Sequence, residues 1–228
     1  AAGEEEAARA VLRAAEARGS RRQSAVGTAV TVVEVLPRIA STFDEDITQA
    51  LQKLLQRQGL KFHLGTYVES AEKTEGGVKL TAAKGDKKLE FEAEKLLVAV
   101  GRKPNTEGLG TAEAGVELDE RGCIKIDAEW QTSVSGIYAI GDVVAGPMLA
   151  HKAEQEAIAA VERMVGQPGS VNYDVIPWVI YPSPEVATVG LTEAEAVEKG
   201  HEVGMGIFPF QANGRAVASG YADGLAKR

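Results

Sequence analysis

The order of strand-forming and helix-forming segments over residues 29–101 constrains the fold of this chain more than any other feature. A β-branched run, Val30-Thr31-Val32-Val33, has the length of a strand and ends in the acid Glu34. A helix is expected next, with Asp44 as its N-cap and Gly59 at its left-handed C-cap. Its apolar face would consist of Ile47, Leu51, Leu54 and Leu55.

Short strands are expected to follow this helix. The first covers residues 61–64, and three more, over 66–73, 78–83 and 88–92, are separated by glycine-containing turns. An apolar run typical of a buried strand, residues 96–100, then ends at Gly101. The order strand, helix, strand, small antiparallel meander and strand predicts half of an α/β nucleotide-binding domain with a β insertion.

The second half of the chain predicts a further α/β region. An apolar strand over residues 137–140 would lead into Gly141-Asp142, and a helix over 150–165 would follow. The residues of this helix that would face inward are Ala153, Ala157, Ile158 and Val161. Gly166-Gln167-Pro168-Gly169 ends the helix and marks a domain boundary.

Short strands over residues 178–181, 186–189 and 202–210 are expected beyond that boundary, with one helix among them. Thr192 and Glu195 form a capping box at the start of that helix, and the chain stops in what the pattern predicts to be a strand. We therefore divide the sequence into an Ala/Glu/Arg-rich helix and linker and three domains, all of them incomplete. Their residues are 1–28, 29–101, 102–169 and 170–228.

Composition excludes several classes of protein. There are 25 Lys and Arg against 33 Asp and Glu, and a net charge of −8 is the opposite of a nucleic-acid-binding footprint. The single cysteine, Cys123, excludes an intrachain disulfide, a Cys-x-x-Cys redox pair and a thiolate-rich metal site, so no metal is expected. No apolar run approaches the ~20 residues of a membrane span. The first residues resemble neither a secretory signal nor a transit peptide, so a reducing, soluble compartment is expected.

Glu34 is a candidate ligand of a dinucleotide. An acid at the carboxyl end of the second strand of such a fold accepts hydrogen bonds from both hydroxyls of an adenosine ribose, and it repels a 2′-phosphate, which favours NAD over NADP. The alternative is a solvated charge at a strand end. The Gly-x-Gly-x-x-Gly turn expected roughly 20 residues upstream is missing, because Gly3 and Gly19 alone precede Gly27.

Asp142 is a second candidate. It follows an apolar strand and Gly141, whose lack of a Cβ permits close approach of a ligand, and its carboxylate can accept a hydrogen bond from a polyol such as the ribityl chain of a flavin. A Gly-Asp pair is also a common turn.

Residues 29–228 resemble the flavin disulfide oxidoreductases and, among them, the dihydrolipoamide dehydrogenases. The segments that carry the resemblance are 30–34, 101–105, 137–153, 181–186 and 208–216. Met-Leu-Ala-His-Lys-Ala at 148–153 separates the lipoamide enzymes from glutathione and mercuric reductases. The implied fold class is α/β: a partial Rossmann-like FAD/NAD(P)-binding domain of three β/β/α layers, followed by the start of an α+β dimerisation domain. Residues 29–101 would be NAD-binding, 102–169 FAD-contacting, and 170–228 part of the dimer interface.

The resemblance also implies which residues bind cofactors. Glu34 would hold the adenosine ribose of NAD, Val68 would flank its adenine and Gly101 would line the nicotinamide side. Asp142 would bind the FAD ribityl chain. The flavin pyrimidine edge would lie along Met148, Leu149, Ala150 and His151. These last residues open a helix, whose N-terminal amides and dipole would stabilise negative charge on the reduced flavin.

The function implied is that of an FAD- and NAD-dependent dihydrolipoamide dehydrogenase, which oxidises dihydrolipoyl groups and passes a hydride through the flavin to NAD⁺. Its partners would be a second copy of itself and the lipoyl domains of 2-oxo acid dehydrogenase complexes, with no nucleic acid and no membrane. Its location would be a bacterial cytoplasm or the mitochondrial matrix.

The chain departs from the family in ways that bear on activity. The flavin pyrophosphate turn, the redox cysteine pair and the His-Pro…Glu dyad are absent, since none of the histidines is followed by proline. Pro182-Ser183 also stands where the family usually has Thr-His. The isolated chain is therefore expected to be inactive and to contain no catalytic residue. Two alternatives stay open: a non-catalytic remnant or structural module with vestigial cofactor surfaces, and a diaphorase-like flavin NADH oxidoreductase.

Overall fold

The structure, a computed structural model, describes residues 29–228, and the helix and linker expected over residues 1–28 lie outside the described residues. The chain forms two compact units. One joins the segment that ends at Gly101 to Pro177–Arg228, and the other is Arg102–Ile176. None of the helices in the described part is long and apolar enough to cross a membrane.

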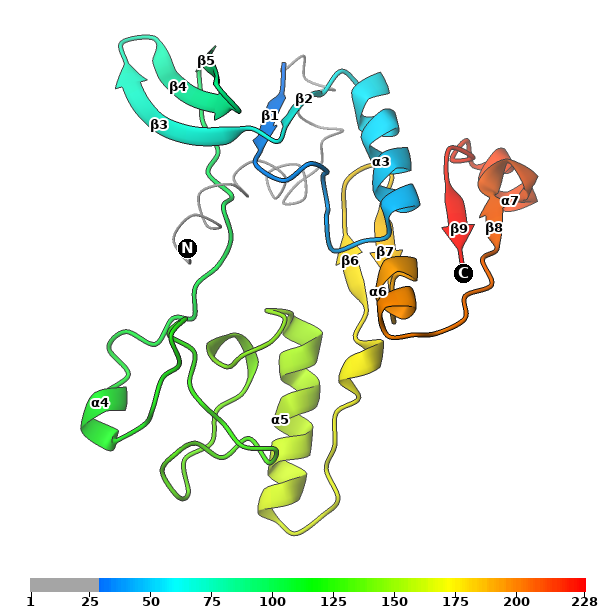
Figure 1. The fold of residues 1–228 in the computed structure, drawn as a ribbon. Coiled ribbons are helices and arrows are strands. Elements are labelled where there is room, and N and C mark those ends of the chain that lie inside the picture. The colour runs from blue at the N-terminus through cyan, green and yellow to red at the C-terminus, as the bar shows by residue number, and fades with distance from the viewer. Residues whose placement is uncertain (1–28) are drawn as a thin grey trace. The chain divides into compact units, whose positions relative to one another are not determined.

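A β–α–β element opens the first unit (Figure 1). It consists of β1 (Thr31–Glu34), α3 (Glu45–Arg57) and β2 (Lys61–Leu64), and β1 runs parallel to β2. As the sequence predicts, Asp44 caps α3 by accepting the Asp46 N–H at 3.2 Å, and Gly59 follows the helix with φ +94°. The helix buries Leu51 and Leu55 in the main core of the unit.

A three-stranded antiparallel meander follows, as predicted. Its strands are β3 (Tyr67–Thr74), β4 (Gly77–Lys84) and β5 (Lys87–Ala93), in the order β3–β4–β5. Leu80 and Ala82 of β4 pack with Val33 of β1, and this small cluster holds the meander against the first strand.

The strand predicted over residues 96–100 is wrong. Within the described part of the chain this segment has no regular secondary structure, and Leu97 and Val98 are 51% and 63% exposed. A strand is held by hydrogen bonds to a neighbour, and the sheet of β1 and β2 has two strands and does not include this segment. Apolar composition alone therefore did not suffice to make residues 96–100 a strand.

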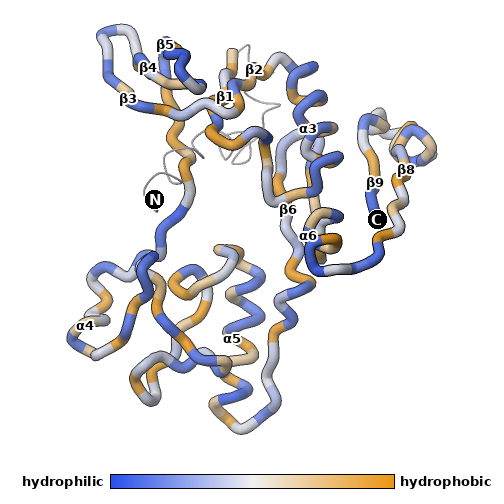
Figure 2. Tube along the Cα trace, in the orientation of Figure 1, coloured by the Kyte–Doolittle hydropathy of each residue, from blue (hydrophilic) through white to orange (hydrophobic). Residues whose placement is uncertain are grey.

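The C-terminal segment completes the first unit with short elements. They are β6 (Trp178–Ile180), β7 (Val186–Thr188), α6 (Glu193–Glu198), β8 (Ile207–Pro209), α7 (Gly214–Ala218) and β9 (Leu225–Lys227). Trp178, Ile180 and Val186 pack on the core formed by α3, so segments far apart in sequence share one hydrophobic core. Figure 2 shows the hydropathy of each residue along these segments. The predicted capping box of α6 is confirmed: Thr192 accepts the Glu195 N–H at 3.3 Å, and the Thr192 N–H donates to Glu195 Oε2 at 2.8 Å. The predicted strand over 202–210 forms over three residues.

The second unit has little regular strand. It contains α4 (Thr111–Ala114), the 3₁₀ helix η1 (Gly141–Val143), α5 (Ala150–Met164) and the 3₁₀ helix η2 (Tyr173–Val175). The strand predicted over 137–140 is reduced to a single bridge between Gln131 and Tyr138, because its neighbours are loops and not strands. The segment is nonetheless extended as it enters η1, since Ile140 has φ −141° and ψ 169°.

Helix α5 forms where it was predicted, but its buried face is different. Its buried residues are Lys152, Glu156, Ala159 and Ala160, whereas Ile158 and Val161, expected inside, are 56% and 57% exposed. Two alanines on the inner face let Trp130 pack closely on the helix, and the two charged residues are paired with each other. The pairing of the two charged side chains and the close packing of Trp130 on the alanines therefore determine which face of α5 is buried, and the number of apolar residues on a face does not.

The second unit continues beyond the glycine-rich segment at which the sequence analysis placed a boundary. Val171 packs against Trp130 and the alanines of α5, and the Tyr173 hydroxyl donates to Glu156 Oε1 at 2.9 Å. Because of these contacts with α5, residues 170–176 are part of the second unit and not of the unit that contains the C-terminal strands.

Candidate functional site

The predicted cofactor-binding residues fall on both compact units. Glu34, Val68 and Gly101 belong to the first, and Asp142 with residues 148–151 belongs to the second. The structure brings the members of the second group together on a turn and a helix N-terminus. In the first group, Glu34 lies on β1 and Val68 on β3, two strands of different sheets that pack against each other.

The Gly141-Asp142 turn lies directly against α5. Gly141 has φ +75°, and a Cβ built there would stand 3.1 Å from the Cβ of Ala153. Both the left-handed backbone and the contact with the helix therefore favour glycine at this position. The turn delivers Asp142 at the start of η1.

Two charged residues of α5 bind the turn. The Gly141 N–H donates to Glu156 Oε2 at 2.7 Å, and Lys152 Nζ donates to the Gly141 carbonyl oxygen at 3.1 Å. Lys152 and Glu156 also form an ion pair at 3.2 Å, with their side chains 0% and 1% exposed. Lys152 lies within the motif at 148–153, whereas Glu156 was not among the residues predicted from sequence. Opposite charges at i and i+4 on a helix were the available signal.

The Asp142 carboxylate is accessible. Its side chain is 45% exposed, and its Oδ2 lies 3.1 Å from Nη1 of Arg102. A carboxylate has four acceptor positions, so this one contact leaves capacity for the hydroxyl groups of a polyol.

The N-terminus of α5 carries no side-chain cap. Leu149 occupies the N-cap position and makes no side-chain hydrogen bond, and the first turn contains no acid. Met148 and Leu149 are half-buried, and Ala150 and His151 are exposed. The positive end of the helix dipole at this terminus favours a partner with negative charge. An accessible carboxylate and a helix N-terminus in the same compact unit are groups of the kind that could bind a flavin dinucleotide.

Glu34 is not the solvated charge that the sequence analysis kept as an alternative. Its residue is 3% exposed, and its Oε1 accepts the Leu36 N–H at 2.9 Å. The carbonyl oxygen of Glu34 accepts the Thr66 N–H, also at 2.9 Å, which ties β1 to the start of β3. Val68 of β3 is half-buried and packs on the cluster of Val33. Gly101 is exposed, has φ +125° and ends the first segment of this unit.

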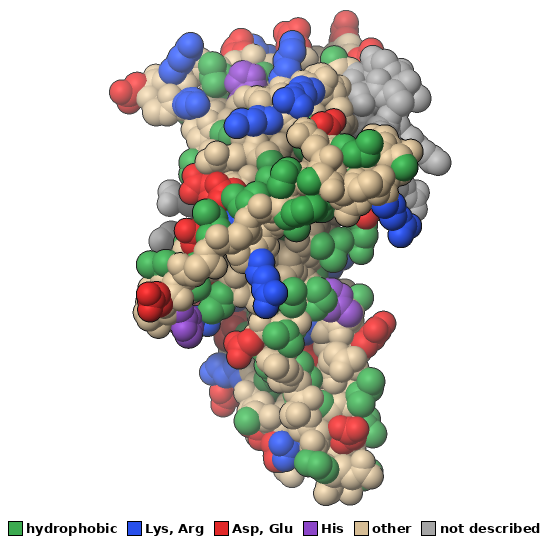
Figure 3. Space-filling view, turned by 90° about the vertical axis from the view of Figure 1, so that its right-hand side faces the viewer, with side chains coloured by type: hydrophobic (Ala, Val, Ile, Leu, Met, Phe, Trp, Pro, Cys, Tyr) green, Lys and Arg blue, Asp and Glu red, His purple; other side chains and the backbone are tan. Residues whose placement is uncertain are grey.

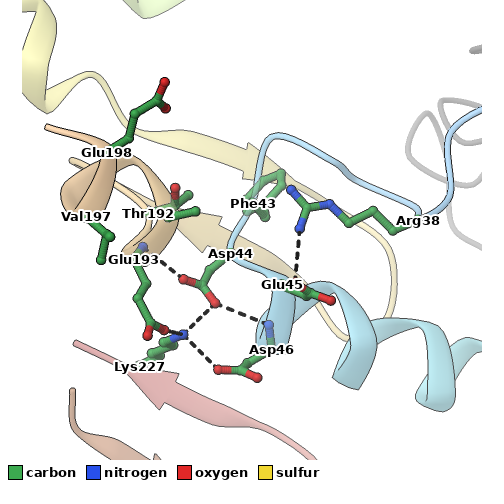
Figure 4. A pocket seen from close by; sticks show the side chains of 11 residues that line it. Arg38, Phe43, Asp44, Glu45, Asp46, Thr192, Glu193, Val197, Glu198 and Lys227 are labelled. Atoms are coloured by element: carbon green, nitrogen blue, oxygen red, sulfur yellow. Dashed lines mark hydrogen bonds and ion pairs between the residues drawn. The ribbon is translucent and has the colours of Figure 1, made fainter. Parts of the chain in front are cut away.

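A charged cluster elsewhere in the first unit was missed. Lys227 Nζ of β9 lies 2.7 Å from Asp44 Oδ1, 2.7 Å from Asp46 Oδ2 and 2.6 Å from Glu193 Oε2 (Figure 4). These residues line a cavity of about 530 Å³. Burial raises the pKa of Asp44, but hydrogen bonds from Lys227 and from the backbone outweigh it, so that pKa is lowered. The residues come from three distant segments, which no spacing rule connects.

Cys123 is a buried thiol. It is 7% exposed, and burial together with the nearby Asp119 raises its pKa. A protonated, enclosed thiol is a poor nucleophile, which fits the expectation of an inert side chain.

Comparison with known families gives two matches. The pyridine nucleotide-disulphide oxidoreductase family matches residues 6–157, and the dimerisation domain of the same oxidoreductases matches residues 176–228.

The chain is 47% identical to the dihydrolipoyl dehydrogenase of Cupriavidus necator over 203 residues, which are 89% of this chain and 43% of that protein. It is also 47% identical to the mitochondrial dihydrolipoyl dehydrogenase of Pisum sativum over 204 residues, covering 89% of this chain and 41% of that protein. The chain therefore spans less than half the length of these relatives.

Solved flavoproteins share the fold. The HOCl-induced flavoprotein disulfide reductase of Escherichia coli superposes with a TM-score of 0.79 at 26% identity, over 90% of this chain and 46% of the other. LpdA from Mycobacterium tuberculosis superposes with a TM-score of 0.84 at 25% identity, over 96% and 47%. The α/β fold class with the start of a dimerisation domain is thereby confirmed. This chain belongs to the pyridine nucleotide-disulphide oxidoreductase family.

Proposed function

We propose that this chain is the part of an FAD- and NAD-dependent dihydrolipoyl dehydrogenase that supplies one side of the flavin site and part of the NAD-binding domain. The observation that carries the proposal is the Gly141-Asp142 turn, which is hydrogen-bonded to the buried face of α5. The N-terminus of that helix, which has no side-chain cap from Leu149, lies in the same unit. Identity of 47% to dihydrolipoyl dehydrogenases supports the choice of substrate class.

On the flavin side, the accessible Asp142 carboxylate would accept hydrogen bonds from the ribityl hydroxyls. The pyrimidine edge would lie along Met148, Leu149, Ala150 and His151. The first-turn amides of α5 would there stabilise negative charge on the reduced flavin. FAD, when bound, supplies the electron transfer between a dithiol and a nicotinamide. The protein residues orient it and set the charge of its surroundings.

On the nucleotide side, Glu34 would bind the adenosine ribose of NAD, Val68 would flank the adenine and Gly101 would line the nicotinamide. The buried Glu34 side chain already accepts a backbone N–H, as expected for a carboxylate held in one orientation. Its charge favours NAD over a 2′-phosphorylated dinucleotide.

The chain does not carry a complete route for electrons. Its single cysteine, Cys123, is buried with a raised pKa, so a dithiol has no disulfide to reduce in this polypeptide. We expect the isolated chain to lack dihydrolipoamide oxidation, and the complete enzyme to be a homodimer that acts on the lipoyl domains of 2-oxo acid dehydrogenase complexes, in a bacterial cytoplasm or the mitochondrial matrix.

Titration of FAD into the chain, followed by flavin fluorescence, tests this function. We expect saturable binding that Asp142→Ala weakens about tenfold, since a hydrogen bond to a charged group contributes roughly 1.5–3 kcal/mol. The matched control is Glu154→Gln, which changes an exposed acidic residue of α5 in the same unit. Binding that Asp142→Ala leaves unchanged contradicts the flavin site.

Complementation separates the three functional hypotheses. The chain is mixed with FAD and with the portion of the Cupriavidus necator relative that it does not cover. NADH formation from dihydrolipoamide supports the proposal. A colourless protein without activity favours the non-catalytic remnant, and a yellow protein that reduces dyes but does not act on dihydrolipoamide favours the diaphorase-like enzyme.

A further inference from the structure

We infer that Lys152 and Glu156 are positioning residues: together they fix the Gly141-Asp142 turn on α5 and thereby set the place of the Asp142 carboxylate. The part of this inference that concerns FAD rests on the proposed function. The part that concerns the turn stands on the geometry of the second unit alone.

The pair binds the same glycine from both sides. Glu156 accepts the Gly141 N–H at 2.7 Å and Lys152 donates to the Gly141 carbonyl oxygen at 3.1 Å. These two groups belong to the peptide planes before and after the Gly141 Cα, so both planes are held. The next side chain along the backbone is Asp142, whose direction from the main chain follows from the second plane.

Glu156 cannot easily rotate away from the turn. Its Oε2 accepts the Gly141 N–H, and its Oε1 accepts from the Tyr173 hydroxyl at 2.9 Å and forms the ion pair with Lys152 at 3.2 Å. The Tyr173 oxygen in turn accepts from Nε1 of the buried Trp130 at 3.1 Å. Hydrogen bonds in such a chain reinforce one another in a low-dielectric interior. The orientation of Glu156 is therefore set by segments on both sides of α5 in sequence.

Burial makes the arrangement costly unless it is complete. Both side chains are within 1% of full burial, and a buried ion pair often contributes no net stability compared with apolar residues of the same volume. Its retention here is explained by what it binds, since neither an alanine nor a leucine could hold both polar groups of Gly141. A role in fixing the conformation of the turn accounts for a pair that stability alone does not require.

Three variants test the inference on the 228-residue chain. Lys152→Met with Glu156→Ala removes the pair without leaving a buried unpaired charge. Lys152→Met with Glu156→Gln removes the charges but keeps one amide oxygen for the Gly141 N–H. Glu154→Gln, on the exposed face of α5, is the control.

The first readout is hydrogen exchange of the Gly141 amide, measured by NMR relative to the Ala160 amide of the same helix. We expect the Met/Ala variant to raise this ratio about tenfold or more, because the N–H loses its charged acceptor, and the Met/Gln variant to restore part of the protection. A ratio equal to that of the wild type in the Met/Ala variant overturns the inference, since a purely structural pair would change both amides together.

The second readout is the affinity for FAD. We expect it to fall in the order wild type, Met/Gln, Met/Ala, with the control equal to the wild type. If the Met/Ala variant does not fold, the Met/Gln variant decides: an unchanged Gly141 exchange ratio and unchanged FAD affinity overturn the inference. If the wild type does not bind FAD, the proposed flavin site fails, and the exchange ratio alone still supports or overturns the role of the pair.

Discussion

Gly141 shows how a single residue can depend on both backbone conformation and packing. Its φ of +75° lies in the left-handed region, and Ala153 of α5 leaves little room for a Cβ. Gly136 lies in the same unit with φ +83°, but no atom comes within 4 Å of the position a Cβ would occupy. The two glycines therefore separate the cost of the backbone conformation from the cost of the contact.

We expect Gly141→Ala to lower the free energy of unfolding of the second unit by about 2–3 kcal/mol, and Gly136→Ala by about 1–2 kcal/mol. The larger effect at Gly141 has its cause in the helix, whose backbone must shift for the two methyl groups to fit. Urea unfolding of each variant, followed by helical circular dichroism, measures the difference. Equal losses for the two substitutions would show that the contact with Ala153 relaxes freely.

Individual residues differ in how far their structural environment could be predicted from sequence. Asp142 could be selected as a candidate from sequence because an apolar segment, a glycine and an acid follow one another, and its role stays a prediction. Glu156 was not, because a charge in a helix is usually solvated, and its partner atoms belong to the backbone of a residue 15 positions earlier. The burial of Glu34 was likewise unpredictable from an acid at a strand end.

At the scale of elements, α5 has an apolar face that the described chain leaves exposed. Ile158, Val161 and Val165 are 56%, 57% and 66% exposed, and Met164 is 48% exposed. The helix was predicted to within one residue, since its N-terminal motif and C-terminal glycine were read correctly. Its orientation was not, because hydrophobicity favoured the face that the ion pair and the alanines did not occupy.

Substitution of that face tests its exposure. We expect Ile158→Lys with Val161→Lys to change the free energy of unfolding by less than about 1 kcal/mol, the usual result for surface positions, while lowering the binding of a dye that detects exposed apolar surface. Ala160→Lys, which buries a charge beside Trp130, should prevent folding of the unit. Circular dichroism and dye fluorescence measure both effects. Loss of structure in the double variant would place these side chains in the core.

The cluster around Lys227 joins three elements of the first unit, β9, α3 and α6. The Lys227 side chain is 9% exposed and contacts three carboxylates, among which Asp46 and Glu193 are nearly half exposed. Burial lowers the pKa of Lys227, but the three carboxylates outweigh it and raise that pKa. Asp44 has a lowered pKa, so its contribution to stability is present above its ordinary value of 3.8 and is lost as the pH falls through the lowered value.

We expect Lys227→Met to reverse this dependence on pH. Without the ammonium group Asp44 is half-buried beside two other carboxylates, so its pKa rises, and the variant loses stability as the pH increases through that raised pKa. The loss relative to the wild type should be about 1–3 kcal/mol at neutral pH and should shrink below about pH 4. Urea unfolding at several pH values measures it, with the exposed Lys53→Met of α3 as control. A loss independent of pH would mean that the methylene packing of Lys227, and not its charge, is what counts.

At the scale of the whole molecule, the described residues form four small hydrophobic clusters, two in each unit, and leave much apolar surface exposed. Figure 3 shows hydrophobic side chains on the face that carries the C-terminal elements, where Ile207, Phe208, Val217 and Tyr221 are each about half exposed. The strand order and the turns of the first unit could be read from sequence, because each is specified locally. The fate of residues 96–100 could not, because it depends on neighbours distant in the chain.

We predict that residues 170–176 stabilise the second unit. Two polypeptides are compared, residues 102–176, which follow the contacts of the structure, and residues 102–169, which end at the glycine-rich segment. We expect the longer one to fold and the shorter one to be less stable by about 2–4 kcal/mol. The shorter polypeptide lacks Val171 and Tyr173, so Trp130 Nε1 loses its hydrogen-bond acceptor and Glu156 loses one of its two hydrogen-bond donors. Thermal unfolding and the dispersion of amide resonances measure the difference.

Tyr173→Phe in the longer polypeptide isolates the hydrogen bonds and should account for about 1 kcal/mol or more of the loss. If both polypeptides unfold at the same temperature, the contacts of residues 170–176 do not stabilise the unit, and the glycine-rich segment is its boundary.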